Sequence, residues 1–301
     1  MAPWGWLRRA RAEVAAHQAE QRAATAELRR RRAEFDADRQ RFEALATPAL
    51  AARVREACLD RSSPAIELAP AGPVSAQDPT ASRFGGQPYV PAGFRLPPHP
   101  PADSPVIYTF LAQVNLAEVY AEISPWPGGL DELPQHGLLQ VWALRDEEGG
   151  DAILTSGDHW TLAVWFADPD PAAHDPSNTA APVRSSPSAP MAMAVRSTYS
   201  HADGWECPPG ITDDEWIAYT HILSPPPPHQ LLGTPNPQGY DPLRVHGRAG
   251  GSRRRSLLQL APDQRLGPDW MPSLGVIIVV IEEAHLHAGD LEQAWAELTY
   301  S

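Results

Sequence analysis

The chain has 301 residues, of which 43% are hydrophobic, so it is long enough to bury one large core or two ordinary ones. Its formal net charge of −13 disfavours nucleic acid as a partner, because an acidic body repels phosphate, and the absence of lysine excludes Schiff-base chemistry. The 34 prolines favour loops and short strands over long helices. Two distant cysteines and the absence of a long apolar run predict a cytoplasmic protein without a membrane segment.

Charge is distributed unevenly along the chain. Residues 1–61 carry 13 Arg against 9 acidic residues, whereas residues 62–301 carry 11 Arg against 28. An acidic body attracts cationic surfaces. We therefore expect a basic protein as partner, if the protein has one.

The first 48 residues are predicted to form a helical arm. An apolar residue recurs every seven positions, although Gln21 interrupts the series and Pro48 ends the helix. The members of this seam are Leu7, Val14, Leu28, Phe35 and Phe42. A single apolar seam suits docking on the chain's own domain, capture of a partner, or a homodimer, of which we favour the last two.

The most regular stretch is Val106 to Leu116, in which two sets of mainly apolar residues alternate. A period of two predicts a strand covered on both faces, with Phe110, Ala112 and Val114 on the same face. The stretch is introduced by a turn that contains Gly85, Gly86 and Pro88, where the paired glycines permit positive φ.

A weaker copy of this arrangement follows later. Its turn contains Gly233 and Pro235, and Gln259 follows Gly233 by 26 residues, as Gln113 follows Gly86 by 27. Both copies continue to a glycine that opens an apolar run, Gly137 in the first and Gly275 in the second. The prediction is an α+β domain at 49–301, mainly antiparallel, in two pseudo-repeated halves at about 62–166 and 225–301.

The remaining predicted elements are shorter. Asn115 is expected to cap a short helix, and Thr212 with Glu215 forms a capping-box pattern before another. A Pro-rich loop is predicted over 168–190. Further strands are predicted at 66–68, 137–144, 159–166, 191–199, 256–260 and 276–281.

Familiar catalytic motifs are absent, so no catalytic residue is assigned and no cofactor is expected. His285 and His287 are predicted on a short helix, where residues two apart diverge, so no metal site is assigned. Gln113, Asn115 and Gln259 end apolar strands, where they would line a pocket between the two halves or, alternatively, bond to nearby loops. Together with His229, Asp263 and Trp270 they are the tentative ligand-binding residues.

Several ordered segments resemble the YwqG-like bacterial domain family. In the first half they are Ser82–Pro91 (SRFGGQPYVP), Phe110–Leu116 (FLAQVNL) and Leu133–Gln140 (LPQHGLLQ). In the second half they are His229–Gln238 (HQLLGTPNPQ) and Leu257–Leu260 (LLQL). The resemblance covers about residues 49–301 and leaves the arm outside it.

The resemblance implies a single α+β domain of unknown function. Some members are encoded near polymorphic-toxin loci, which implies an immunity-type binding role. This chain departs from the family's Trp-Gly-Asp-x-Gly pattern, since Trp270 is followed by Pro272, Ser273 and Gly275. The resemblance favours a final strand at 294–299, where the spacing of Leu291, Trp295 and Leu298 alone would also allow a helix.

The function expected from these observations is a non-catalytic binding module, of an immunity or toxin-neutralising kind. The alternative is an enzyme or small-molecule-binding protein with a site between the two halves, where His229 would act as a general base, Asp263 would orient it and Trp270 would stack on a ligand.

Overall fold

The structure is a computed structural model of the chain. It describes residues 30, 32, 37–58, 62–72, 78–97, 106–123, 132–146, 161–178, 183–184, 186–199, 207–223, 227–237, 241–243, 253–267, 270–271 and 275–300. Its internal contacts divide the chain into two compact units, Met1–Leu59 with Glu206–Pro225 and Asp60–Trp205 with Pro226–Ser301. We call them the helical unit and the sheet unit. The predicted boundary after residue 48 stays a prediction, and the helix that begins at Pro48 falls in the helical unit.

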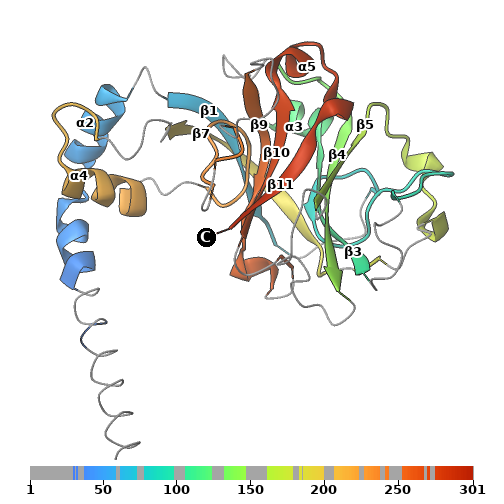
Figure 1. The fold of residues 1–301 in the computed structure, drawn as a ribbon, viewed down its shortest axis with the longest axis horizontal. Coiled ribbons are helices and arrows are strands. Elements are labelled where there is room, and N and C mark those ends of the chain that lie inside the picture. Colours follow the sequence, from blue (N-terminus) through green and yellow to red (C-terminus); the bar gives the residue numbers. More distant parts are fainter. Residues whose placement is uncertain are drawn as a thin grey trace, which may run out of the picture. The chain divides into compact units, whose positions relative to one another are not determined.

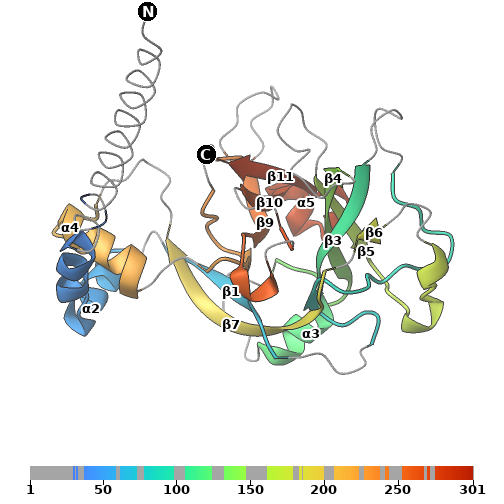
Figure 2. The same ribbon diagram turned by 90° about the horizontal axis from the view of Figure 1, so that it is seen from below.

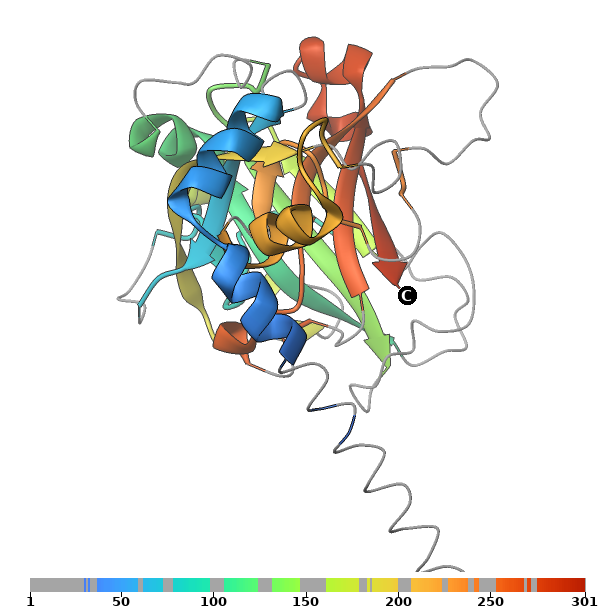
Figure 3. The same cartoon turned by 90° about the vertical axis from the view of Figure 1, so that its left-hand side faces the viewer.

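The helical unit contains a helix over residues 37–45, α2 (Pro48–Ala57), α4 (Asp213–Ala218) and a π-helical turn (Tyr219–Leu223) (Figure 3). The predicted break at Pro48 is confirmed, because residues 46–47 are not helical and Pro48 opens α2 behind the Thr47 cap. The predicted capping box of Thr212 and Glu215 is also confirmed. Of the apolar seam, Phe42 is half-buried, and Leu7, Val14, Leu28 and Phe35 lie outside the described residues.

Within this unit, Arg53 of α2 donates to the Glu215 carboxylate at 2.8 Å and to the Gly210 carbonyl at 2.8 Å. These bonds tie α2 to the start of α4. In the part of the chain that the structure describes, no helix is long and apolar enough to cross a membrane.

The sheet unit consists of strands joined mostly in antiparallel pairs (Figure 1). Its first strands are β1 (Ser62–Pro70), β2 (Arg83–Phe84), β3 (Val106–Asn115), β4 (Leu138–Asp146), β5 (Thr161–Phe166) and β6 (Val183–Arg184). The others are β7 (Ala189–Tyr199), β8 (Gln230–Leu232), β9 (Arg254–Leu260), β10 (Gly275–Glu282) and β11 (Trp295–Tyr300). Between them lie α3 (Leu116–Glu122), α5 (Glu283–His287) and the 3₁₀ turns η3 (Pro171–Ala173), η4 (Pro176–Asn178), η6 (Gln264–Leu266) and η7 (Leu291–Gln293).

Among the described residues, these eleven strands form one sheet in the order β11-β10-β9-β8-β1-β7-β2-β3-β4-β5, with β6 parallel to β3. The sheet curls nearly closed, because its two end strands meet where the Thr161 hydroxyl donates to the Ala296 carbonyl at 2.7 Å. The predicted mainly antiparallel class is confirmed. The expected strand near the end of the chain is present as β11, paired with β10.

Apolar clusters cover both faces of the sheet. The main core lies on the inner face and includes Ile66, Phe84, Val114, Leu258 and Ile277. Smaller clusters cover the outer faces of β3 and β4, around Phe110 and Trp142, and of β10, around Ile278. The prediction that β3 is covered on both faces is therefore confirmed.

The predicted faces of β3 are wrong beyond Phe110. Phe110 pairs with Trp142 and Ala112 with Val141, so Leu111 is an extra residue, a β-bulge. The bulge turns Phe110 to the outer cluster while Ala112 and Val114 point into the main core. Strand β9 has the same feature at Leu257, which lies between two residues that pair with consecutive positions of β10.

The turns before β3 and β9 share a backbone conformation. Gly85 and Gly86 have φ of 58° and 73°, and Leu232 and Gly233 have φ of 58° and 75°. The positive φ predicted for the paired glycines is confirmed. The prolines that follow, Pro88 and Pro235, are both buried.

Other predicted elements are present with adjusted limits. Asn115 caps α3 as predicted, and His285 and His287 lie on the helix α5. The predicted loop over 168–190 carries η3, η4 and β6, and β7 begins within it at Ala189. The strand β8, which lies between β9 and β1 in the sheet, was not predicted.

Candidate functional site

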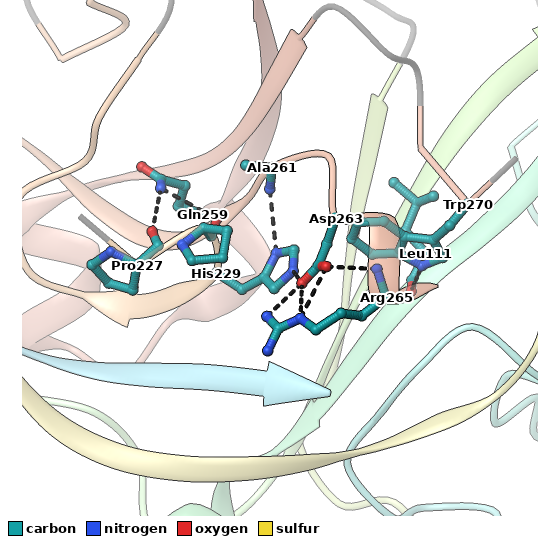
Figure 4. Close-up of polar contacts among 9 residues, drawn as sticks. Leu111, Pro227, His229, Gln259, Ala261, Asp263, Arg265 and Trp270 are labelled. Atoms are coloured by element: carbon teal, nitrogen blue, oxygen red, sulfur yellow. Dashed lines mark hydrogen bonds and ion pairs between the residues drawn. The ribbon is translucent and has the colours of Figure 1, made fainter. Parts of the chain in front are cut away.

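Three of the six tentative site residues meet in the sheet unit (Figure 4). His229 directly precedes β8, Asp263 caps η6 just after β9, and Trp270 follows η6. The His229 Nε2 atom lies 3.3 Å from Asp263 Oδ2, and the His229 ring lies 5.3 Å from the Trp270 ring, centre to centre and edge-on. Strand ends of a curled sheet thus bring together side chains that are up to 41 positions apart in the sequence.

His229 is completely buried, and both of its ring nitrogens have partners. The Ala261 N–H donates to Nδ1 at 3.3 Å, so Nδ1 is an acceptor and the remaining proton sits on Nε2, where it is donated to Asp263. Burial lowers the pKa of His229 to about 4, against the opposing effect of Asp263. The imidazole is therefore neutral at pH 7.

The Asp263 carboxylate is held by a neighbouring arginine. Arg265 Nη2 donates to Asp263 Oδ2 at 2.6 Å, and the Arg265 backbone N–H donates to Oδ1 at 2.9 Å. Burial alone would raise the pKa of Asp263, but these bonds and the arginine charge leave the pKa lowered. Asp263 is thus ionised and paired, and its side chain is only 7% exposed.

Trp270 joins the two parts of the sheet that the predicted halves supply. Its indole N–H donates to the Leu111 carbonyl at 2.9 Å, at the bulge of β3, where the Gly85 N–H also donates at 2.8 Å. The Phe84 ring lies 4.7 Å from His229 and 5.7 Å from Trp270, centre to centre. The three rings form one buried aromatic cluster in the main core.

The two glutamines hold loops, and Gln259 does so beside His229 (Figure 4). Gln259 Oε1 accepts from the Asn236 N–H at 2.6 Å, and its amide donates to the Pro227 carbonyl at 3.1 Å. Gln113 Oε1 accepts from the Tyr89 N–H at 3.0 Å, and its amide donates to the carbonyls of Pro79 and Ala81.

Asn115 lies two residues after Gln113 on β3 and bonds to the same loop. Its side chain accepts from the Ala117 N–H at 3.0 Å and donates to the Thr80 carbonyl at 3.1 Å. The described side-chain contacts of Gln113, Asn115 and Gln259 are mainly hydrogen bonds to the backbone of neighbouring loops, as the alternative interpretation expects.

The sequence reasoning missed three residues of these networks. Arg265 neutralises Asp263, Phe84 packs on His229, and Gln140 donates to Gln113 Oε1 at 3.2 Å. The Asp-x-Arg spacing around Asp263 was a visible signal for the first. The other two contacts depend on strand pairing and leave no local signal.

The cluster has the pairing of a histidine–carboxylate dyad but not its accessibility. A general base must reach the proton that it removes, and His229 has no exposed surface and no spare nitrogen lone pair. Among the residues that the structure describes, no group of three or more His, Cys, Asp or Glu could hold a metal ion. The arrangement suits a structural role, in which a neutral His229 and a paired Asp263 hold the neighbouring segments together through hydrogen bonds.

Residues 82–299 match the family model described as a domain of unknown function, DUF1963. The chain belongs to the DUF1963 family. The matched range includes all six tentative site residues and the strands β3 and β9, which carry Gln113 and Gln259. It ends within β11. No curated protein matches the chain.

Proposed function

We propose that this DUF1963 protein is a non-catalytic binding module for a basic protein partner. The observation that carries the proposal is the closed state of the His229–Asp263–Arg265 group, in which His229 is not accessible as a general base. The sheet unit also carries 25 acidic residues against 12 Arg, which attracts cationic surfaces over long range.

The test is affinity capture with the immobilised full chain in an extract of its native host. A basic partner should be retained and should elute as salt rises, because salt screens charge attraction. His229→Phe is the matched control, since it keeps the surface charge and should capture the same partner. Retention of chaperones alone would contradict the proposal.

We further propose that the chain is a bacterial, cytoplasmic, YwqG-like protein of the immunity or toxin-neutralising kind. Its support is the resemblance of the ordered segments around Gly86, Gln113 and Gln259. If the captured partner is a toxin, its expression alone should stop growth, and co-expression of this chain should restore it. Growth arrest that persists despite a stable complex would argue against neutralisation.

The two pseudo-repeated halves also remain a proposal, supported by several parallels. β2 to β5 pair in sequence on one side of the sheet, and β8 to β11 pair in sequence on the other. The bulge residues Leu111 and Leu257 each precede the corresponding glutamine by two positions. Tyr89 and Asn236, the donors to these glutamines, each follow the turn glycine by three positions.

A homodimer through the N-terminal arm is proposed from the sequence seam alone. Sedimentation of the full chain should be compared with that of a chain carrying Leu28→Glu and Phe35→Glu. The wild type should sediment as a dimer and the variant as a monomer, because charges replace two seam positions. Monomers in both cases would exclude this mode of pairing.

The alternative, an enzyme or small-molecule-binding protein, has one observation in its favour, namely that His229, Asp263 and Trp270 do come together. A thermal-shift screen over metals, nucleotides and sugars tests it. A ligand at about 100 times its dissociation constant adds about 2.7 kcal/mol of stability. A shift in the wild type that is lost in His229→Phe would favour this alternative over the binding module.

A further inference from the structure

Strand β7 is paired along only a short part of one of its two edges in the described part of the chain. It pairs with β1 from Met191 to Tyr199, whereas β2 covers its other side only at Ala189 and Pro190. In the described part of the chain no other strand pairs with β7, and Figure 2 shows it as a long curved strand beside β1. Beyond Pro190, one side of β7 therefore has no strand partner among the described residues.

The alternation of backbone hydrogen bonds along β7 identifies which N–H and C=O groups face this edge. The Ala71 N–H donates to the Pro190 carbonyl at 2.9 Å, so the backbone of residue 190 faces β1. In an antiparallel pair every second residue bonds to the same neighbour, so residues 192, 194 and 196 also face β1. The N–H and C=O groups of Met191, Met193, Val195 and Ser197 face outward.

Between Met191 and Ser197, in the described part of the chain, this edge carries few of the usual protections of an edge strand. Open edges are commonly shielded by charge, proline, a bulge or short length. Between Met191 and Ser197 this edge has one charged residue, Arg196, and Glu67 pairs with it at 2.6 Å. Val195 is 45% exposed, which makes it one of two large exposed hydrophobic residues in the described part of the chain.

We propose that this edge, residues 191–197 of β7, binds an extended segment of a cationic protein partner, which adds to the sheet as a further strand. Main-chain bonds to the outward groups would provide affinity, and alternate side chains of the segment would lie beside Met193 and Val195. The inference rests on the proposed binding function and assigns it a surface.

Charge decides between this occupant and a second copy of the chain. The edge itself is locally neutral, because Arg196 is paired with Glu67. The surrounding sheet unit has 25 acidic residues against 12 Arg, so a second copy would bring like charge to the contact, whereas a cationic segment is attracted. The net charge of the sheet unit therefore favours a cationic segment over a second copy of the chain.

The experiment uses a fluorescent peptide with four Val-Thr repeats flanked by two arginines on each side, and a second peptide flanked by glutamates. Fluorescence anisotropy with the full chain should show binding of the arginine-flanked peptide, at least tenfold weaker binding of the glutamate-flanked one, and loss of affinity with salt. A peptide methylated on alternate backbone nitrogens should bind at least tenfold more weakly, because it cannot complete the ladder.

Val195→Pro removes an outward N–H without touching the bonds to β1, and proline is tolerated at such edge positions. It should weaken peptide binding at least tenfold, while Val195→Thr, which keeps the N–H, should bind like the wild type. Equal binding by Val195→Pro, equal binding of the methylated peptide, or no binding by the wild type would overturn the proposal. So would a dimer of the full chain that Val195→Pro converts to a monomer.

These outcomes separate the edge from the function on which it rests. Capture of the same basic partner by wild type and Val195→Pro would refute the edge and leave the proposed function standing. Peptide binding that depends on the Val195 N–H, without any basic partner from the host, would support the edge and refute the proposed function.

Discussion

The side-chain oxygens of Gln113 and Gln259 accept hydrogen bonds from the backbone N–H groups of Tyr89 and Asn236, at 3.0 and 2.6 Å. Both glutamines are buried, with exposed fractions of 0% and 2%, and the amide of each also donates to loop carbonyls. Each side chain thus fixes the loop that follows a positive-φ turn to the loop that precedes it. At this position the buried glutamine side chain supplies the hydrogen bonds that connect the two loops.

Replacing either glutamine with leucine should destabilise the protein. Gln113→Leu removes the side-chain partner of the Tyr89 N–H and of the Ala81 carbonyl, whereas the Pro79 carbonyl keeps its bond from Arg83. We expect a loss of about 2–4 kcal/mol in the free energy of unfolding, with a similar loss for Gln259→Leu. Urea unfolding provides the measurement. Gln87→Leu, at an exposed position, is the control and should change stability by less than about 0.5 kcal/mol. A large loss for only one glutamine would contradict their equivalence.

Leu232 should respond unusually to small residues. Its φ of 58° costs a residue with a Cβ atom about 1–2 kcal/mol, a cost that glycine avoids. Leu232→Gly and Leu232→Ala both lose the buried side chain, so the glycine variant should be the more stable by about 1 kcal/mol. At Leu231, which is also buried and has no positive φ, the alanine variant should be the more stable. If the alanine variant is the more stable at both positions, Leu232 is not strained.

Much of the sheet could be predicted because its strands are regular. β3, β4, β9 and β10 are apolar runs with glycines or polar residues at their ends, and both caps, Asn115 and Thr212, follow local rules. The bulge at Leu111 could not be predicted, because an extra residue is defined only against a partner strand. The short β8 was missed for a similar reason, since three residues give no period.

Three of the six predicted site residues, His229, Asp263 and Trp270, come together in the fold, but the sequence does not indicate that they are buried. Their burial depends on Phe84, which comes from β2 on the other side of β1 and β7. No local pattern around His229 indicates that contact, so accessibility had to be read from the structure.

The Trp270 indole should contribute a hydrogen bond as well as packing. Trp270→Phe retains an aromatic ring but loses the bond to the Leu111 carbonyl, which then keeps only the Gly85 N–H. We expect a loss of about 1–2 kcal/mol in the free energy of unfolding, by urea titration. Trp295→Phe is the control, because that indole donates to a half-buried carboxylate and its loss should cost less. Equal effects would mean that the bond to the bulge adds nothing.

His229 should make the stability of the protein depend on pH between about 6.5 and 4. Its pKa falls from 6.5 to about 4 on folding, chiefly because burial disfavours the charged ring. Within this window the unfolded chain takes up a proton that the folded protein does not, so stability present above pH 6.5 is lost as pH falls towards 4. The shift corresponds to about 3 kcal/mol, since each pKa unit is worth about 1.4 kcal/mol.

Urea unfolding of the wild type and His229→Phe at several values between pH 7 and pH 4 tests this linkage. The variant has no imidazole at the site and retains a ring against Phe84 and Trp270, so its stability should fall less steeply with acid. The lowered pKa of Asp263 adds its own loss only near and below its ordinary value of 3.8, outside most of this window. His136→Phe, which replaces an exposed histidine, should keep the wild-type slope. If His229→Phe also keeps that slope, His229 is not a buried neutral group in solution.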